Sequence, residues 1–156
     1  MKRSQFSIIT LSLFFLCSTA AYAADTKEAA GPKGADTHEH GTWKEKRFVA
    51  KIDADGVQRA EMVGGEYYYD PNYIIVKVNK PVELKAKKAA GYVPHNLKAN
   101  SPEAGIVFNL DLKGDSQTVK FTPTKKGKYP IFCDKSLLWF KTHREKGMEG
   151  LIEVIE

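Results

Sequence analysis

The stretch that decides the fold is residues 73–87, YIIVKVNKPVELKAK, in which two runs of alternating residues flank a short turn. In each run the polar side chains fall on one face, as expected for a strand with one face toward a core and the other toward water. The turn between them, NKP at 79–81, contains residue types that interrupt strands. The stretch therefore predicts two strands of a half-buried sheet.

The same pattern recurs along the chain from Trp43 onward, with short runs rich in Val, Ile, Tyr and Phe separated by turn residues such as Asp55-Gly56. Strand signals at this spacing favour an all-β fold, with two sheets packed as a sandwich, over a helical or α/β domain. The interval 134–148 is the exception, and it is expected to form either an ordered loop or a short helix. The predicted strands are 47–52, 57–62, 66–69, 73–78, 82–88, 95–99, 118–123, 129–133 and 150–155.

Three segments are predicted along the chain. Residues 1–23 have the form of a secretory signal peptide, with basic residues before an apolar stretch and a small-residue cleavage site at 21–23. Residues 24–42 are small, polar and Gly/Pro-bearing, which predicts a flexible tether, and 43–156 form one domain. No later segment approaches the ~20 apolar residues that a membrane span requires. We expect an exported, periplasmic protein without a membrane span.

The formal net charge is +5, and basic and acidic residues are mixed along the chain. A balance this mild, without basic blocks, does not indicate a nucleic-acid partner.

The cysteine count changes when the signal peptide is removed, because Cys17 leaves with it and Cys133 becomes the only thiol in an oxidising compartment. No intrachain disulfide is then possible, and a dinuclear copper centre with two bridging cysteines is excluded. Cys133 is followed by His143 and Met148 and preceded by His95. A thiolate, two imidazoles and a thioether are typical of electron-transfer copper, whereas structural zinc prefers four strong ligands. The sequence predicts one mononuclear copper site that holds Cu(II) or Cu(I).

An ordered series of motifs supports this interpretation, and over Glu66 to Glu156 the chain resembles the cupredoxin family. The resemblance implies a Greek-key β-sandwich with copper bound by His95, Cys133, His143 and Met148. It also implies that Asn96 ties the ligand loops together and helps orient the cysteine. The motifs are YDP at 69–71, NKPVEL at 79–84, HN at 95–96, FTP at 121–123, GKY at 127–129, and then Cys133, His143, Met148 and Gly150.

The spacing departs from the usual family pattern, because nine residues separate Cys133 from His143. The segment 133–150, CDKSLLWFKTHREKGMEG, resembles the periplasmic green cupredoxins of bacterial copper tolerance. This resemblance implies a copper-binding protein that serves copper tolerance, and it leaves open both cuprous oxidase activity and a blue or green site. No catalytic residue is assigned.

Three alternatives stay open. The first is an electron carrier of a respiratory chain that uses the same four ligands and docks near His143. The second is a copper chaperone or store, and the third is a β-sandwich whose site is empty or holds zinc. Copper ions are the expected partner in the main interpretation and in the first two alternatives, and a further redox or copper-transfer protein partner is left open.

Two further features carry hypotheses. His38 and His40 form a His-x-His cluster that either binds a second copper ion or belongs to a solvated polar tail. The run LLWF at 137–140 is expected to pack and anchor the long loop, with shielding of copper or an apolar docking patch as the alternatives. Basic residues around it are able to steer an acidic partner or simply form the solvated face of the loop. They are Lys135, Lys141, Arg144 and Lys146.

Overall fold

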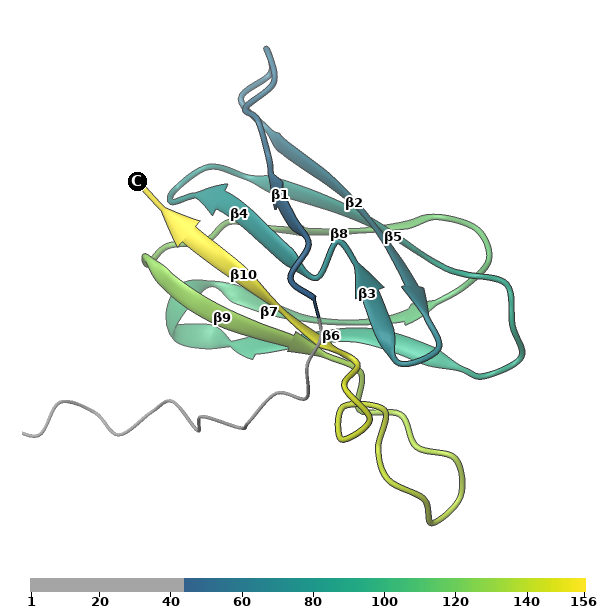
Figure 1. The fold of residues 1–156 in the computed structure, drawn as a ribbon. Coiled ribbons are helices and arrows are strands. Elements are labelled where there is room, and N and C mark those ends of the chain that lie inside the picture. Colours follow the sequence, from purple (N-terminus) through teal and green to yellow (C-terminus); the bar gives the residue numbers. More distant parts are fainter. Residues whose placement is uncertain (1–43) are drawn as a thin grey trace, which may run out of the picture. The chain divides into compact units, whose positions relative to one another are not determined.

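The computed structural model describes residues 44–156, which form a β-sandwich of two sheets. The larger sheet has six strands in the order β1-β4-β10-β9-β6-β7, and the smaller has four in the order β3-β2-β5-β8 (Figure 1). The strands are β1 (Arg47–Val49), β2 (Gln58–Gly65), β3 (Tyr68–Asp70), β4 (Tyr73–Lys77), β5 (Val82–Lys88), β6 (His95–Ser101), β7 (Ile106–Leu112), β8 (Gln117–Phe121), β9 (Gly127–Phe132) and β10 (Glu149–Ile155). The predicted all-β sandwich is confirmed.

The alternation of apolar and polar side chains that predicted β5 gives this strand one face toward the core and one toward solvent. Val82, Leu84 and Ala86 are buried, whereas Lys85 and Lys87 are exposed on the other face. Strand β5 pairs in parallel with β2 and antiparallel with β8, so its polar face lies among charged neighbours of both strands. Burial of one face in each sheet produces a single core between them, with Ile74, Leu84, Leu97, Ile131 and Ile152 among its members.

One strand was not predicted from the sequence, since no strand was predicted between residues 99 and 118. The structure extends β6 to Ser101, turns through a 3-10 helix at Pro102–Ala104 and returns as β7. Strand β7 lies at the edge of the six-stranded sheet, so Asn109 and Asp111 face water there rather than breaking the strand. The polar residues form the solvent face of this strand.

The interval 134–148 takes the form of an ordered loop of turns, and no helix forms in it. Figure 1 shows it projecting beyond the strand ends, between β9 and β10. Among residues 44–156 no helix is long and apolar enough to cross a membrane.

Candidate metal centre

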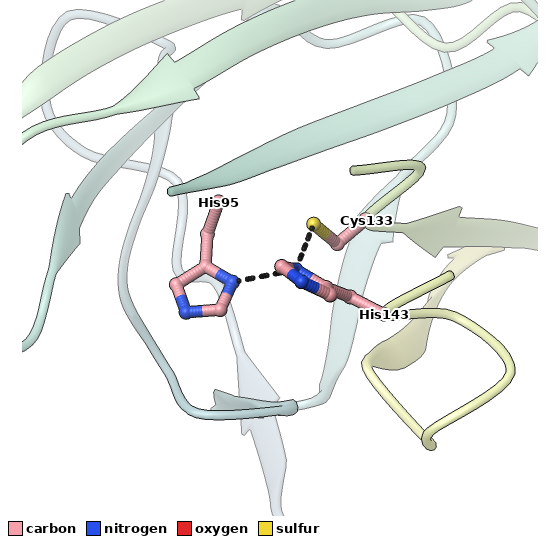
Figure 2. A group of neighbouring side chains, drawn as sticks. All are labelled: His95, Cys133 and His143. Atoms are coloured by element: carbon pink, nitrogen blue, oxygen red, sulfur yellow. Dashed lines mark hydrogen bonds between the residues drawn. The ribbon is translucent and has the colours of Figure 1, made fainter. Parts of the chain in front are cut away.

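Three of the predicted ligands meet at one end of the sandwich. His95 is the first residue of β6, Cys133 directly follows β9, and His143 lies in the loop before β10 (Figure 2). The Nδ1 atoms of the two histidines are 3.1 Å apart, and Cys133 Sγ is 3.4 Å from His143 Nδ1. One possible ligand atom from each residue lies within 4.8 Å of the other two.

These separations fit a shared metal ion. Two atoms bonded to one metal at about 2.0–2.3 Å lie roughly 3–4 Å apart when the coordination is trigonal or tetrahedral. His95 is 3% exposed, and Cys133 and His143 are fully buried. A soft thiolate and two imidazoles in a dry pocket suit copper, which accepts this trigonal set.

Met148 is the fourth predicted ligand, and its backbone binds those of the other two loop ligands. Its N–H donates to the His143 carbonyl at 2.9 Å, and its carbonyl accepts from the Cys133 N–H at 3.0 Å. The side chain is fully buried, with its Cε close to Gly64 of β2. The geometry fixes the chain positions of Cys133, His143 and Met148 relative to one another.

The protonation states also favour a metal. Burial, followed by the neighbouring His143, lowers the pKa of His95 to about 4. Burial, followed by Lys146, lowers the pKa of His143. Both imidazoles are therefore neutral at pH 7, with a lone pair to offer. Burial raises the pKa of the Cys133 thiol, so the metal-free protein holds the proton that a bound metal displaces.

Asn96 joins the two segments that carry His95 and Cys133. Its backbone N–H donates to Cys133 Sγ at 3.4 Å, and its side-chain carbonyl accepts from the Asp134 N–H at 3.1 Å. Its amide nitrogen donates to Asp134 at 2.8 Å and to Asn109 at 2.7 Å. The hydroxyl of buried Tyr69 donates to the Asn96 carbonyl at 2.6 Å. Such a set of bonds holds the sulfur and its loop in one geometry.

The long loop is anchored at its base. The N–H of His143 donates to the Lys135 carbonyl at 2.8 Å, and the N–H of Arg144 donates to the Cys133 carbonyl at 3.0 Å. The Arg144 guanidinium lies 4.4 Å from the centre of the Phe132 ring and pairs with Glu149. Nine residues therefore separate Cys133 from His143 without loosening the position of the histidine.

The tip of this loop contradicts the packing prediction. Leu137, Leu138, Trp139 and Phe140 are all exposed rather than packed on the sandwich. The backbone bonds at the loop base perform the anchoring that was attributed to these side chains.

Tyr67 was not identified from the sequence, although it covers the histidines. Its ring makes edge-on contacts with His143 at 5.1 Å and with His95 at 6.4 Å between ring centres. Lys146 donates to the Tyr67 hydroxyl at 3.0 Å and lies 4.4 Å from the ring centre. Tyr67 is held over the site by the turn between β2 and β3, where its φ is +62°. His143 Nε2 is buried and has no hydrogen-bond partner among residues 44–156.

His38 and His40, the predicted second copper site, lie outside the described residues. The prediction for them stands untested.

No protein-family model and no curated protein matches the chain. Solved structures share its fold. The metal binding domain of the Cu(I) exporting P-type ATPase CopA of Streptococcus pneumoniae D39, solved with Cu(I), is 19% identical, with 73% of this chain and 100% of that chain covered and a TM-score of 0.53. Dithionite-reduced auracyanin from the photosynthetic bacterium Roseiflexus castenholzii is 18% identical, with 63% and 97% covered and a TM-score of 0.50.

A heme-copper terminal oxidase dimer solved by cryo-EM is 20% identical in the matching chain, with 86% of this chain and 85% of that chain covered and a TM-score of 0.51. These similarities establish the cupredoxin fold. The assignment of the site comes from this chain's own residues and not from the similar structures. A buried thiol and two neutral imidazoles at metal-ligand separations, with Met148 beside them, have the geometry of a type 1 copper site.

Proposed function

We propose that this protein is a periplasmic cupredoxin of copper tolerance that binds copper through His95, Cys133, His143 and Met148. The observation that carries the proposal is the buried cluster of His95, Cys133 and His143, in which His143 is supplied by an unusually long yet well-anchored loop. Copper bound there would supply one-electron chemistry between Cu(I) and Cu(II). The chain's own residues hold the two imidazoles neutral, fix the cysteine through Asn96 and exclude water.

The fold alone does not choose between copper handling and electron transfer, since it is shared by a domain of a Cu(I) exporting ATPase and by an auracyanin. The burial of His143 against Tyr67 favours copper handling over electron transfer. An electron carrier that docks near His143 benefits from an accessible imidazole edge, whereas this imidazole is fully buried and lies against Tyr67. A protected site suits a protein that retains the ion.

The ligand assignment is tested by adding Cu(II) to the purified protein. We expect an intense visible charge-transfer band that disappears in Cys133→Ser. The double variant His38→Ala/His40→Ala is the matched control, because it keeps the band and loses copper only if the tail holds a second ion. A band that survives in Cys133→Ser would refute the copper-thiolate assignment.

The physiological role is tested in cells. Deletion of the gene should raise copper sensitivity, and the wild-type gene should restore tolerance while the Cys133→Ser gene should not. Unchanged copper sensitivity combined with slower respiration would instead assign the protein to electron transfer.

Cuprous oxidase activity is tested by loading the protein with Cu(I) without oxygen and then admitting air, so that dioxygen accepts the electron. Oxygen uptake that continues over many equivalents of added Cu(I) would show turnover, because the Cu(II) band reports only the single ion held by each protein. Failure of the band to appear would remove the enzymatic role and leave binding alone.

A further inference from the structure

The loop between β9 and β10 carries four consecutive large apolar side chains that face solvent. The exposed fractions are 50% for Leu137, 70% for Leu138, 83% for Trp139 and 56% for Phe140. We refer to residues 137–140 as the apolar tip. Isolated exposed apolar residues are common on protein surfaces, but a contiguous group of this size indicates an interaction site.

The backbone of the apolar tip holds its side chains outward. The Phe140 N–H donates to the Leu137 carbonyl at 3.1 Å, which closes a turn, and Leu138 has a φ of +55°. This left-handed conformation is unfavourable for leucine, so the surrounding turn maintains it at an energetic cost. The rings of Trp139 and Phe140 stack at 5.9 Å between centres, and both side chains are exposed.

The charges around the apolar tip are mainly positive. Two acidic side chains of the loop are engaged locally, Asp134 with Lys98 at 2.7 Å and Glu145 with the Thr142 hydroxyl at 2.8 Å. The same loop carries four basic side chains. Lys135 pairs with Asp111 at 2.8 Å and Arg144 with Glu149, which leaves Lys141 and Lys146 without an ion pair among residues 44–156. A surface that accepts this loop must therefore be apolar within and negatively charged at its edge.

We propose that the apolar tip inserts into the interfacial layer of an anionic lipid bilayer. Tryptophan is enriched at the boundary between lipid and water, and apolar residues flanked by Lys and Arg bind there through burial and charge attraction together. The tip of a projecting loop needs a matching pocket on a protein partner, whereas a fluid lipid surface adapts to it (Figure 1). Because Phe140 is three positions before His143, docking would bring the metal centre to the membrane surface.

The test is sedimentation of the copper-loaded, signal-free protein with vesicles of phosphatidylglycerol and phosphatidylethanolamine, compared with phosphatidylcholine alone. We expect binding to the anionic vesicles that weakens as salt is raised. In a Trp43→Phe background, Trp139 emission should shift to shorter wavelength on binding. Leu138→Ser/Trp139→Ser should weaken binding by about tenfold or more, and Lys141→Gln by about fivefold.

The control is Val107→Ser, which removes another exposed apolar side chain, 57% exposed, at the opposite end of the sandwich. It should bind vesicles as the wild type does. Retention of the visible copper band in every variant shows that each has folded. Absence of binding to anionic vesicles, or equal binding by the tip variant and Val107→Ser, would overturn the proposal. Self-association that depends on the tip, without vesicle binding, would assign the tip to a second copy of the chain.

Discussion

The side chain of Asn96 connects the strand that carries His95 to the residue after Cys133, and its removal tests how the site is held together. In Asn96→Ala the backbone bonds from Asn96 to Cys133 Sγ and from Tyr69 to the Asn96 carbonyl remain available. Only the three side-chain hydrogen bonds are lost, two to Asp134 and one to Asn109. The substitution therefore separates the role of the amide from that of the backbone.

The magnitude follows from the bonds. A neutral hydrogen bond contributes about 1 kcal/mol, and a bond to a charged group about 1.5–3 kcal/mol. Asn96 is buried and bonds to the Asp134 carboxylate, whose pKa is lowered first by Lys98 and so stays ionised at pH 7. We expect Asn96→Ala to lower the free energy of unfolding of the metal-free protein by about 2–4 kcal/mol. Copper affinity should fall about 10–100-fold, as for other residues that orient metal ligands.

The assays are urea unfolding without metal and competition for copper with a chelator of known affinity. Asn109→Ala is the control, because Asn109 is exposed and shares just one of the three bonds. It should cost about 0.5–1 kcal/mol and leave copper affinity within about twofold. If the two variants were indistinguishable in both assays, the argument that Asn96 holds the cysteine loop would be wrong.

Three other measurements follow from the site and its supports. At pH 7 one proton should be released per copper bound, from Cys133, and the release should exceed one as the pH falls toward the His95 pKa of about 4. Calorimetry in buffers of different ionisation enthalpy measures the number of protons released. A value near zero or two at pH 7 would contradict these protonation states. Tyr67→Ala should speed copper removal by an external chelator about tenfold, whereas Tyr67→Phe should change the rate little, since the ring and not the hydroxyl covers the histidines. Equal rates of copper removal from the two variants would contradict this role of the ring. Gly150→Ala should cost about 1–3 kcal/mol in urea unfolding, because its Cβ would lie 2.3 Å from a backbone oxygen, whereas Gly114→Ala meets nothing within 4 Å and should stay near neutral.

Much of the sandwich could be predicted because apolar and polar side chains alternate along its strands with a period of two residues. Strand β5 shows this directly, since its apolar positions are the buried ones. Strand β7 carries the same signal at Ile106, Phe108, Leu110 and Leu112, but it was not predicted, and Asn109 and Asp111 lie on its other face. At a sheet edge such residues simply face water.

The metal centre was predictable in its chemistry more than in its surroundings. The ligand types indicated copper before any geometry was known, and the structure brings His95, Cys133 and His143 together. Tyr67 carried no comparable signal, because it is one of three consecutive tyrosines, and a positive φ in the turn decides which of them covers the site. The apolar tip was misjudged because apolar composition alone does not distinguish packing from exposure.

The distribution of ligands over separate strands makes the metal a crosslink. An ion shared by His95 and Cys133 closes a loop of about 38 residues, for which the chain-entropy treatment of disulfides gives about 4 kcal/mol. Cys133 is the only cysteine among residues 44–156, so this part of the chain has no disulfide of its own. Copper would thus act as a removable crosslink between β6 and the end of β9. After loss of the ion, the two strands would be held by their hydrogen bonds, the Lys98–Asp134 ion pair and the core packing of Leu97 and Ile131.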